Sequence, residues 1–338
     1  MKSILIKVAW RLLAICIGLW VMLAFAFSPG LPKSLRTPAA SVSAVILILS
    51  LFSWRRIRFA RVLALITLFI GGVVWIGIRP SNERQWVPEV RETPWGEING
   101  DTVTIHNVRN FSYRTESDFD PVYETRTFNI QELTEVDILV AYWGSKAIGH
   151  VMVSFGFNNR EFIAFSIETR KEIGEEYSAI KGFFRNYEIT YVVADERDVI
   201  GVRASHRVPE EQVHVLRTRM ALENGRKLFL HYVQKTNQLR EQPSFYNTLT
   251  TNCTTQVLGL VQALGGVADY TWKILLSGYV PEYLYETETL MPGMSLEEIM
   301  SKSLVNERAK QFAGDPEFSV RIREGVPRPE PRAQPLQR

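Results

Sequence analysis

The stretch HVMVSFGF at residues 150–157, followed by NNRE at 158–161 and FIAFSIE at 162–168, decides the fold of the main part of the chain. Both apolar stretches are short and rich in β-branched and aromatic residues, which favours strands. The short turn between them contains Asn158 and Asn159, residue types that favour tight hairpin turns. The sequence therefore predicts a β-hairpin at the centre of this region.

Further strands and helices are predicted on both sides of this hairpin. The strand-like stretches are 102–108, 138–142, 187–193 and 213–217, of which the first alternates apolar and polar residues. A helix is predicted over 223–239, ending before Pro243, and another over 254–264, ending at Gly265-Gly266. This order of elements predicts an α+β fold in which an antiparallel sheet packs on a few helices.

The first quarter of the chain is much more apolar than the rest. Its apolar segments at 12–27, 39–54 and 62–78 lie near the lower end of the roughly 17–25 residues that cross a bilayer. We therefore expect three transmembrane helices in a membrane anchor over 1–79. A cleaved signal peptide is the alternative for the first segment, but no convincing small-x-small cleavage site follows it.

The other domain boundaries follow from composition. Residues 80–99 contain Pro80, Pro88 and Pro94 and are predicted to be a linker. Residues 100–325 form the main domain, and the Pro-rich, charged segment 326–338 is predicted to be a disordered tail.

Positive charges around the apolar segments predict the orientation in the membrane. Lys2, Lys7 and Arg11 precede the first segment, and four arginines, including Arg55 and Arg56, separate the second from the third. Short loops rich in Lys and Arg stay in the cytoplasm. The N-terminus is therefore expected in the cytoplasm of a bacterium, with the inner membrane crossed three times and the main domain in the periplasm.

The composition disfavours several classes of partner. The net charge is only +3 and no basic run is interleaved with aromatic residues, so no nucleic-acid partner is expected. No Gly-rich nucleotide loop is present, and the five histidines form no HxH or HxxxH pair. We therefore expect no metal and no cofactor, and the sequence predicts no oligomeric state.

Cysteine usage singles out one thiol. Cys16 lies inside the first apolar segment, whereas Cys253 has no disulfide partner in the main domain. An unpaired cysteine in an oxidising compartment indicates a reactive thiol or an intermolecular bridge. Polar residues up to Asn252 precede Cys253 and a helical pattern follows it. We therefore expect Cys253 at a helix N-terminus, where the helix dipole lowers the pKa of a thiol.

A cysteine nucleophile needs a base, and His150 is the best-placed histidine. It opens the first strand of the hairpin after Gly149, and a histidine at a strand end can reach a cysteine at a helix end. His231 is predicted in mid-helix and His206 among exposed charges. The alternative is a buried cysteine and a satisfied histidine that never meet, and residue patterns alone leave both open.

Several motifs resemble those of a known family. They are Val108-Arg109-Asn110-Phe111-x-Tyr113-Arg114, His150-x-x-x-Ser154-Phe155-Gly156-Phe157, Ser166-Ile167-Glu168-Thr169-Arg170, Gly174-Glu175-Glu176-Tyr177-Ser178, Ala194-Asp195-Glu196-Arg197-Asp198 and Tyr246-Asn247 through Asn252-Cys253-Thr254-Thr255. In this order they resemble the N-terminal periplasmic domain of the lipoprotein N-acyltransferase family Lnb. The resemblance implies a catalytic Cys–His pair, which corresponds to Cys253 and His150.

The order of histidine first and cysteine later is also similar to permuted papain-like enzymes, of the NlpC/P60 or lecithin:retinol acyltransferase type. That likeness implies a thioester on Cys253, with the Cys253 N–H and the Asn252 side chain holding the oxyanion. Ser166 or Glu168 is the candidate that orients the imidazole. Candidates for binding the substrate head group are Arg109, Arg114, Arg170, Tyr246 and Asn247. For the charged residues, buried ion pairs that fix loops are the alternative.

The expected function is that of a membrane-anchored, periplasmic thiol acyltransferase that acts on lipid or lipoprotein acyl esters at the bilayer. The motifs cover only the periplasmic domain of the family, so the acyl acceptor is left open. A cysteine peptidase or amidase acting on the cell wall is a second possibility. A non-catalytic membrane scaffold is a third, and it predicts that Cys253→Ser has no effect.

Overall fold

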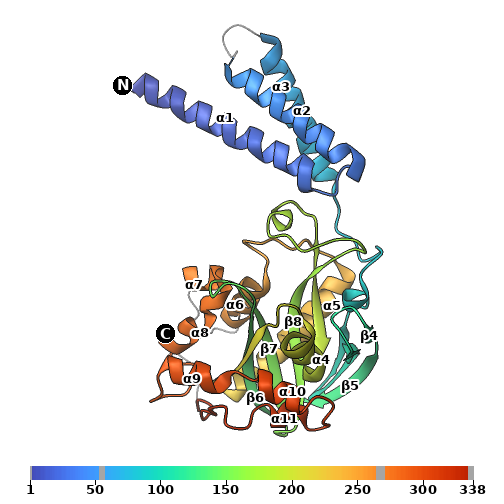
Figure 1. Ribbon diagram of the computed structural model, residues 1–338, viewed down its shortest axis with the longest axis vertical. Helices are drawn as coiled ribbons and strands as arrows, with labels where there is room; N and C mark the ends of the chain where they lie inside the picture. The colour runs from blue at the N-terminus through green and yellow to red at the C-terminus, as the bar shows by residue number, and fades with distance from the viewer. Residues whose placement is uncertain (1, 53–57, 264–270, 334–338) are drawn as a thin grey trace. The chain divides into compact units, whose positions relative to one another are not determined.

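The computed structural model describes residues 2–52, 58–263 and 271–333 (Figure 1). The chain divides into two compact units. The first unit comprises residues 1–83, 175–188 and 244–248, and the second comprises 84–174, 189–243 and 249–338.

The strands are β1 (Trp95–Asn99), β2 (Thr102–Arg109), β3 (Ser112–Tyr113), β4 (Phe119–Asp120), β5 (Tyr123–Asn129), β6 (Leu133–Tyr142), β7 (Gly149–Phe157), β8 (Glu161–Arg170), β9 (Glu188–Ala194) and β10 (Gln212–Arg217). The helices are α1 (Lys2–Phe27), α2 (Lys33–Phe52), α3 (Arg58–Gly77), α4 (Glu196–Gly201), α5 (Leu222–Glu241), α6 (Cys253–Ala263), α7 (Trp272–Leu275), α8 (Val280–Glu286), α9 (Leu296–Ser303), α10 (Asn306–Gln311) and α11 (Phe318–Arg321). Short 3-10 turns lie at Pro88–Val90, Ile130–Glu132, Lys181–Phe183 and Ser277–Tyr279, and a π-helical turn lies at Val202–His206.

The predicted hairpin is formed by β7 and β8. Its register runs from Phe157 opposite Glu161 to Met152 opposite Ser166. Asn158 and Asn159 adopt φ values of 51° and 56°, in the left-handed region that asparagine tolerates better than most residues. The turn chemistry of the sequence therefore sets the register of the strands that carry the site.

An eight-stranded sheet forms the centre of the second unit, with the strand order β1-β2-β9-β8-β7-β6-β10 and β5 paired with β2. The pairs β1–β2, β2–β5, β6–β7, β7–β8 and β6–β10 are antiparallel. One parallel contact joins Arg109 of β2 to Ala194 of β9. This mostly antiparallel sheet with helices confirms the predicted α+β class.

Alternation along the strands gives the sheet two different faces. On one face, side chains such as Met152 and Ala164 pack with α4, α10 and α11 through Val199, Ala309 and Phe318. These helices lie in front of the sheet in Figure 1. On the other face, aromatic rings of β7 and β8 contact Phe229 and Tyr232 of α5. Because the period of a strand is two, even-numbered residues of β7 and β8 all belong to the α4 face.

The three apolar segments of the N-terminus form α1, α2 and α3, which are longer at their N-terminal ends than the segments predicted. In the described parts of these helices, no stretch is both long enough and apolar enough to cross a membrane, so the prediction of three spanning helices is not supported.

Other predicted segments have the following structures. The expected linker at 80–99 contains the turn Pro88–Val90 and strand β1. Residues 327–333 have no helix or strand, but the Arg332 N–H donates to the Arg219 carbonyl, so this part of the tail follows a defined path. Arg55, Arg56, the Gly265-Gly266 helix end and residues 334–338 lie outside the described residues.

Candidate functional site

His150 lies at the open end of the β7–β8 hairpin. Continuing the register by one pair places His150 opposite Glu168, because Met152 pairs with Ser166. These side chains share the α4 face of the sheet. His150 Nε2 lies 2.6 Å from Ser166 Oγ and 3.1 Å from Glu168 Oε1, and Ser166 Oγ donates to Glu168 Oε1 at 2.7 Å. The spacing of Ser166 and Glu168 along one strand is what lets both reach the same imidazole nitrogen.

Cys253 is the first residue of helix α6. The Asn252 side-chain oxygen accepts from the Thr255 N–H at 2.9 Å and from the Thr254 hydroxyl at 3.0 Å. The Asn252 carbonyl also accepts from the Gln256 N–H. Asn252 is therefore the N-cap of α6, and its side-chain oxygen is engaged in capping. The thiol lies at the positive end of the helix, beside first-turn N–H groups that have no acceptor within the helix.

The structure brings the His150 imidazole close enough to the Cys253 thiol for each to shift the pKa of the other. The backbone N–H of Val151, next to His150 in β7, also lowers the pKa of the thiol. Burial raises the pKa of the thiol, but the hydrogen bond and positive charge of His150 outweigh burial and hold the pKa of Cys253 below its usual value. The thiol is partly buried, which restricts the access of water to it.

The pKa of His150 moves in the opposite direction. Burial alone lowers the pKa of an imidazole, but the Glu168 carboxylate and the hydrogen bond to Cys253 outweigh burial and raise the pKa of His150 to about 9. Burial likewise raises the pKa of Glu168, yet the positive charges of His150 and Arg203 hold it well below its usual range. At neutral pH, the site therefore holds an imidazolium between a carboxylate and a thiol whose pKa is lowered.

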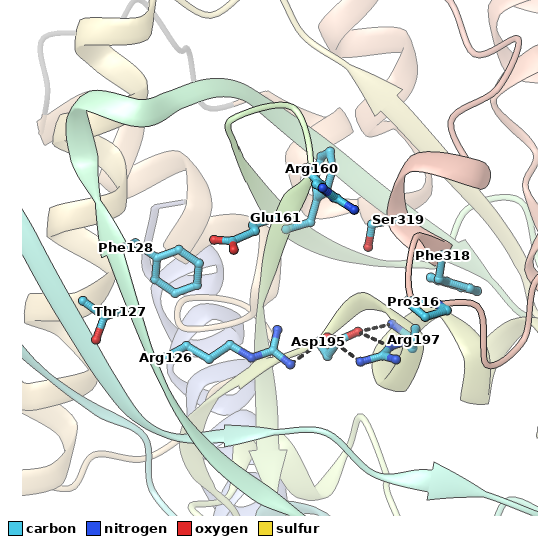
Figure 2. Close-up of a pocket in the computed structure, with 11 residues that line it drawn as sticks. Arg126, Thr127, Phe128, Arg160, Glu161, Asp195, Arg197, Pro316, Phe318 and Ser319 are labelled. Atoms are coloured by element: carbon cyan, nitrogen blue, oxygen red, sulfur yellow. Dashed lines mark hydrogen bonds and ion pairs between the residues drawn. The ribbon is translucent and has the colours of Figure 1, made fainter.

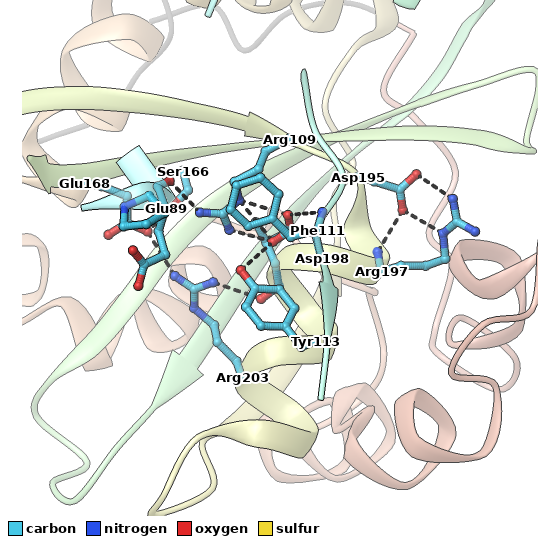
Figure 3. A network of polar contacts seen from close by, with 12 residues as sticks. Glu89, Arg109, Phe111, Tyr113, Ser166, Glu168, Asp195, Arg197, Asp198 and Arg203 are labelled. Atoms are coloured by element: carbon cyan, nitrogen blue, oxygen red, sulfur yellow. Dashed lines mark hydrogen bonds and ion pairs between the residues drawn. The ribbon is translucent and has the colours of Figure 1, made fainter. Parts of the chain in front are cut away.

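Arg203 completes this network and was not predicted from the sequence. It lies in the π-helical turn Val202–His206, and its Nη2 donates to Glu168 Oε1 at 2.9 Å (Figure 3). Its Nη1 donates to the Val199 carbonyl, and its Nε lies 3.6 Å from Glu211 Oε2. Only 3 % of its side chain is exposed. A buried arginine that holds Glu168 fixes the carboxylate on which the imidazole depends.

Arg109 and Arg170, two of the arginines considered for binding a head group, hold backbone segments in place. Arg109 makes a buried bidentate ion pair with Asp198 of α4 and donates to the Glu89 carbonyl (Figure 3). Arg170 donates to the carbonyls of Val90 and Arg91. The contacts of both residues match the alternative drawn from the sequence, in which the charges fix loops.

Arg114 lies in an exposed turn and pairs with Asp118 and Asp120. Tyr246 and Asn247 belong to the first unit, in which the Tyr246 N–H donates to the Tyr187 carbonyl at 3.0 Å. Tyr246 is buried. None of these contacts shows a place for a substrate head group.

His214 illustrates the difference between a packed histidine and His150. Its Nδ1 lies 3.0 Å from Ser303 Oγ and 3.1 Å from the Met300 carbonyl. Burial lowers the pKa of His214 to about 4, so this imidazole stays neutral. Across the described residues, no group of three or more His, Cys, Asp or Glu side chains has the arrangement of a metal site.

A separate polar cavity of about 370 Å³ lies beside β5, α4 and the start of α11 (Figure 2). Arg126, Arg160 and Arg197 line it, as does Asp195. Arg126 and Arg197 both pair with Asp195, and Arg160 pairs with Glu317. Because these cations already have carboxylate partners, the cavity has no evident excess of positive charge for an anion.

Comparison with known proteins gives a match in the region that carries the site. Residues 119–278 match the family model described as the Lnb N-terminal periplasmic domain. This confirms the resemblance drawn from the motifs and indicates a periplasmic location for this part of the chain. The matched range contains both Cys253 and His150. No curated protein and no solved structure gives a match.

Proposed function

We propose that this protein is a periplasmic thiol acyltransferase that takes an acyl chain from a lipid or lipoprotein ester onto Cys253. The observation that carries the proposal is the arrangement of Cys253 beside His150, with His150 in contact with Glu168 and Arg203 behind the carboxylate. A nucleophile, a base and a group that orients the base are the parts that covalent acyl transfer requires. The family match over the same residues supports acyl transfer over other cysteine chemistry.

Each part has a defined role in the first half of the reaction. The Cys253 thiolate attacks the carbonyl carbon of the ester, and the carbonyl π electrons move to oxygen. When this tetrahedral intermediate collapses, the C–O bond to the alcohol breaks. The leaving alkoxide takes the proton of the His150 imidazolium. Because Nε2 contacts Ser166 and Glu168, Nδ1 is the nitrogen that faces the reaction. The product is an acyl-thioester on Cys253 and a lyso-lipid or lyso-lipoprotein.

The second half runs these roles in reverse. An amine or water attacks the thioester carbonyl, and neutral His150 accepts the proton that the nucleophile loses. The C–S bond then breaks and regenerates the thiolate. An amine gives an N-acyl product, whereas water gives a free fatty acid. Glu168 keeps the imidazolium stable at both stages and holds the ring in one orientation.

Backbone N–H groups at the start of α6 stabilise the tetrahedral oxyanion. The Cys253 N–H lies at the first position of the helix, where the helix dipole favours negative charge. The Asn252 side-chain oxygen is engaged as the helix cap, so its part is to hold the first turn in place. A cysteine at a helix start and a histidine earlier on a strand is also the order expected of permuted papain-like enzymes.

Association with the inner membrane is part of the same proposal, with the N-terminus in the cytoplasm. It is supported by the large apolar side chains that α1, α2 and α3 expose, such as Leu12, Val45 and Phe69. Exposed apolar surface on this scale indicates contact with lipid or with another apolar surface. An anchored enzyme meets an acyl ester at the bilayer surface and does not have to extract it into water.

Intact-mass measurement after mixing with a diacyl lipopeptide in lipid micelles tests the proposal. The protein carries Cys16→Ser so that Cys253 is the only thiol, and Cys253→Ala and His150→Ala variants run beside it. We expect a mass increase of one acyl chain on Cys253 together with release of lyso-lipopeptide, and neither signal in Cys253→Ala. His150→Ala should slow both by about two to four orders of magnitude, the usual contribution of a general base.

The lyso-lipopeptide signal covers the case in which the thioester turns over too quickly to accumulate. Cleavage of a peptide bond in the substrate, with no acyl adduct and no lyso product, would instead identify a peptidase. An unchanged substrate and unchanged protein would leave a non-catalytic scaffold as the better explanation.

A further inference from the structure

Residues 175–188, which connect β8 to β9, form an ordered loop in the first unit and present apolar side chains to the outside. Ile180 is 53 % exposed and Phe183 is 42 % exposed. The loop has internal backbone hydrogen bonds. The Gly182 N–H donates to the Ser178 carbonyl, and the Phe184 N–H donates to the Lys181 carbonyl. A rigid loop with exposed apolar side chains needs an explanation other than flexibility.

The loop is held at one end of the helices of the same unit. The Phe184 ring lies 6.1 Å from that of Phe27, the last residue of α1, and 6.5 Å from that of Trp75, near the end of α3. Arg185 Nη1 donates to the Trp75 carbonyl at 2.9 Å, and its guanidinium stacks on the Trp75 ring at 4.6 Å. Five side chains therefore lie together where α1 and α3 end: Trp20, Phe27, Trp75, Phe184 and Arg185.

This combination of residues is typical of a membrane–water boundary. Trp rings are enriched at the level of the lipid head groups, and Arg side chains extend their charge toward water from that level. Beyond this cluster, α1 and α3 expose large apolar side chains, among them Leu12, Phe69 and Ile76. Ile180 and Phe183 therefore extend the apolar surface of the helices at the end where the chain leaves α3.

We propose that Ile180 and Phe183, with the neighbouring Tyr177, insert into the head-group boundary of the bilayer that α1, α2 and α3 enter. The inference rests on the membrane association in the proposed function and names the second element that takes part in it. The occupant is a lipid surface, because the loop continues the exposed apolar surface of the helices. The loop carries acidic as well as basic residues, so apolar insertion drives the contact and attraction to anionic lipid contributes little.

The loop also holds the segment that precedes the nucleophile. Thr248 Oγ1 donates to the Ala179 carbonyl at 2.7 Å, and the Tyr246 N–H donates to the Tyr187 carbonyl. At Gly182, an added Cβ would collide with the Thr248 side chain, so the two segments are in close contact. Thr248 lies five residues before Cys253 in the chain. Within the first unit, the loop therefore holds residues 244–248 in place.

Site-directed spin labelling of the full chain in lipid vesicles tests this proposal without relying on activity. Cys16 and Cys253 are changed to Ser, and a nitroxide is attached at Ile180→Cys, at Phe69→Cys or at Val208→Cys. Val208 is 90 % exposed and lies outside both the loop and the three N-terminal helices, so its label is the reference for water. The vesicles contain phosphatidylcholine and phosphatidylglycerol in equal parts, and relaxation by oxygen is compared with relaxation by a water-soluble nickel chelate.

We expect oxygen to relax the labels at Ile180 and Phe69 more strongly than the nickel chelate does, and the reverse at Val208. A lipid signal at Phe69 with a water signal at Ile180 would overturn the role of the loop and leave the anchor intact. Water signals at both would overturn the anchor itself. Spin–spin broadening at Ile180 with protection from both reagents would show a second copy on the loop, which also overturns the proposal.

Discussion

Two clusters of buried charges lie on the same face of the sheet, four residues apart along β7. At His150, the cluster consists of Glu168, Arg203 and the Cys253 thiol. At Ser154, the cluster consists of Glu196, Asp137 and Arg323. Both contain an almost fully buried arginine that binds a carboxylate, with 3 % of each arginine side chain exposed.

The two clusters differ in which groups lie next to the carboxylate that the buried arginine binds. Arg323 donates to Asp137 at 2.8 Å and twice to Glu196 at 2.7 Å, and its guanidinium lies over the Phe162 ring. Those contacts join the end of α11 to α4 and β6 and include no nucleophile. Glu168 instead contacts an imidazole that lies beside a thiol. A buried ion pair therefore only joins segments of the chain in one place, whereas in the other its carboxylate also raises the pKa of a histidine.

The largest expected effect comes from breaking the Arg323 cluster. Arg323→Met leaves the carboxylates of Glu196 and Asp137 buried without their cation. Burial raises the pKa of Asp137 to about 6 even with Arg323 present, which shows that a charge at this position is costly. Removing one member of a buried ion pair typically costs about 3–5 kcal/mol. We expect the free energy of unfolding to fall by about that amount, measured by urea denaturation in detergent.

Arg321→Met, at the last residue of α11 and two positions before Arg323, is the matched control. Arg321 is exposed and pairs with Glu324 at the surface. Exposed pairs contribute little to stability, so this variant should unfold close to the parent protein. Equal losses in both variants would show that the Arg323 cluster is no more important than a surface pair.

The second prediction tests the electrostatics of the site. In Glu168→Gln, the imidazolium of His150 loses the negative charge that stabilises it. The positive charge of Arg203 remains nearby, so the pKa of His150 falls. An opposite charge at this distance typically shifts a pKa by about 1–3 units. The upper inflection in the pH dependence of Cys253 alkylation should therefore move from about 9 to a lower pH. Iodoacetamide labelling in the Cys16→Ser background measures it.

Glu161→Gln provides the control for this second prediction, because Glu161 lies at the other end of β8 and is exposed. Its pH profile should match that of the parent protein. An unchanged upper inflection in Glu168→Gln would show that Glu168 does not set the protonation of His150, and the comparison between the two clusters would fail.

The sequence predicts one cluster far better than the other. His150, Ser166 and Glu168 follow from a strand period of two and a hairpin whose turn fixes the register, and Cys253 follows from the start of a helical pattern. Arg203 does not, because it lies in a π-helical turn after a short helix that no strong periodicity marks. Arg323 is 186 residues from Asp137, and local patterns carry no information about such pairings. Local patterns thus predict which residues meet at His150, whereas the buried arginines of both clusters depend on tertiary packing.

The smallest expected effect compares two buried serines, one from each cluster. Ser166 Oγ contacts both His150 and Glu168, and Ser154 Oγ donates to Glu196 at 2.6 Å. Each hydroxyl makes a hydrogen bond worth about 1 kcal/mol, or roughly a fivefold change in an equilibrium or a rate. Ser166→Ala should slow Cys253 alkylation at neutral pH by about that factor and should also lower the free energy of unfolding by about 1 kcal/mol, because its buried hydroxyl donates to Glu168. Ser154→Ala should lower the free energy of unfolding by about 1 kcal/mol and leave the alkylation rate unchanged.

The two serine variants are compared by two measurements, the free energy of unfolding and the rate of Cys253 alkylation. Both side chains are almost fully buried, and each substitution removes one oxygen atom, so a general packing defect should affect both variants alike. A structural role for Ser166 predicts lost stability with normal thiol reactivity. Only a hydroxyl that helps to hold the imidazole and its carboxylate in place changes the reactivity of Cys253 as well as the stability.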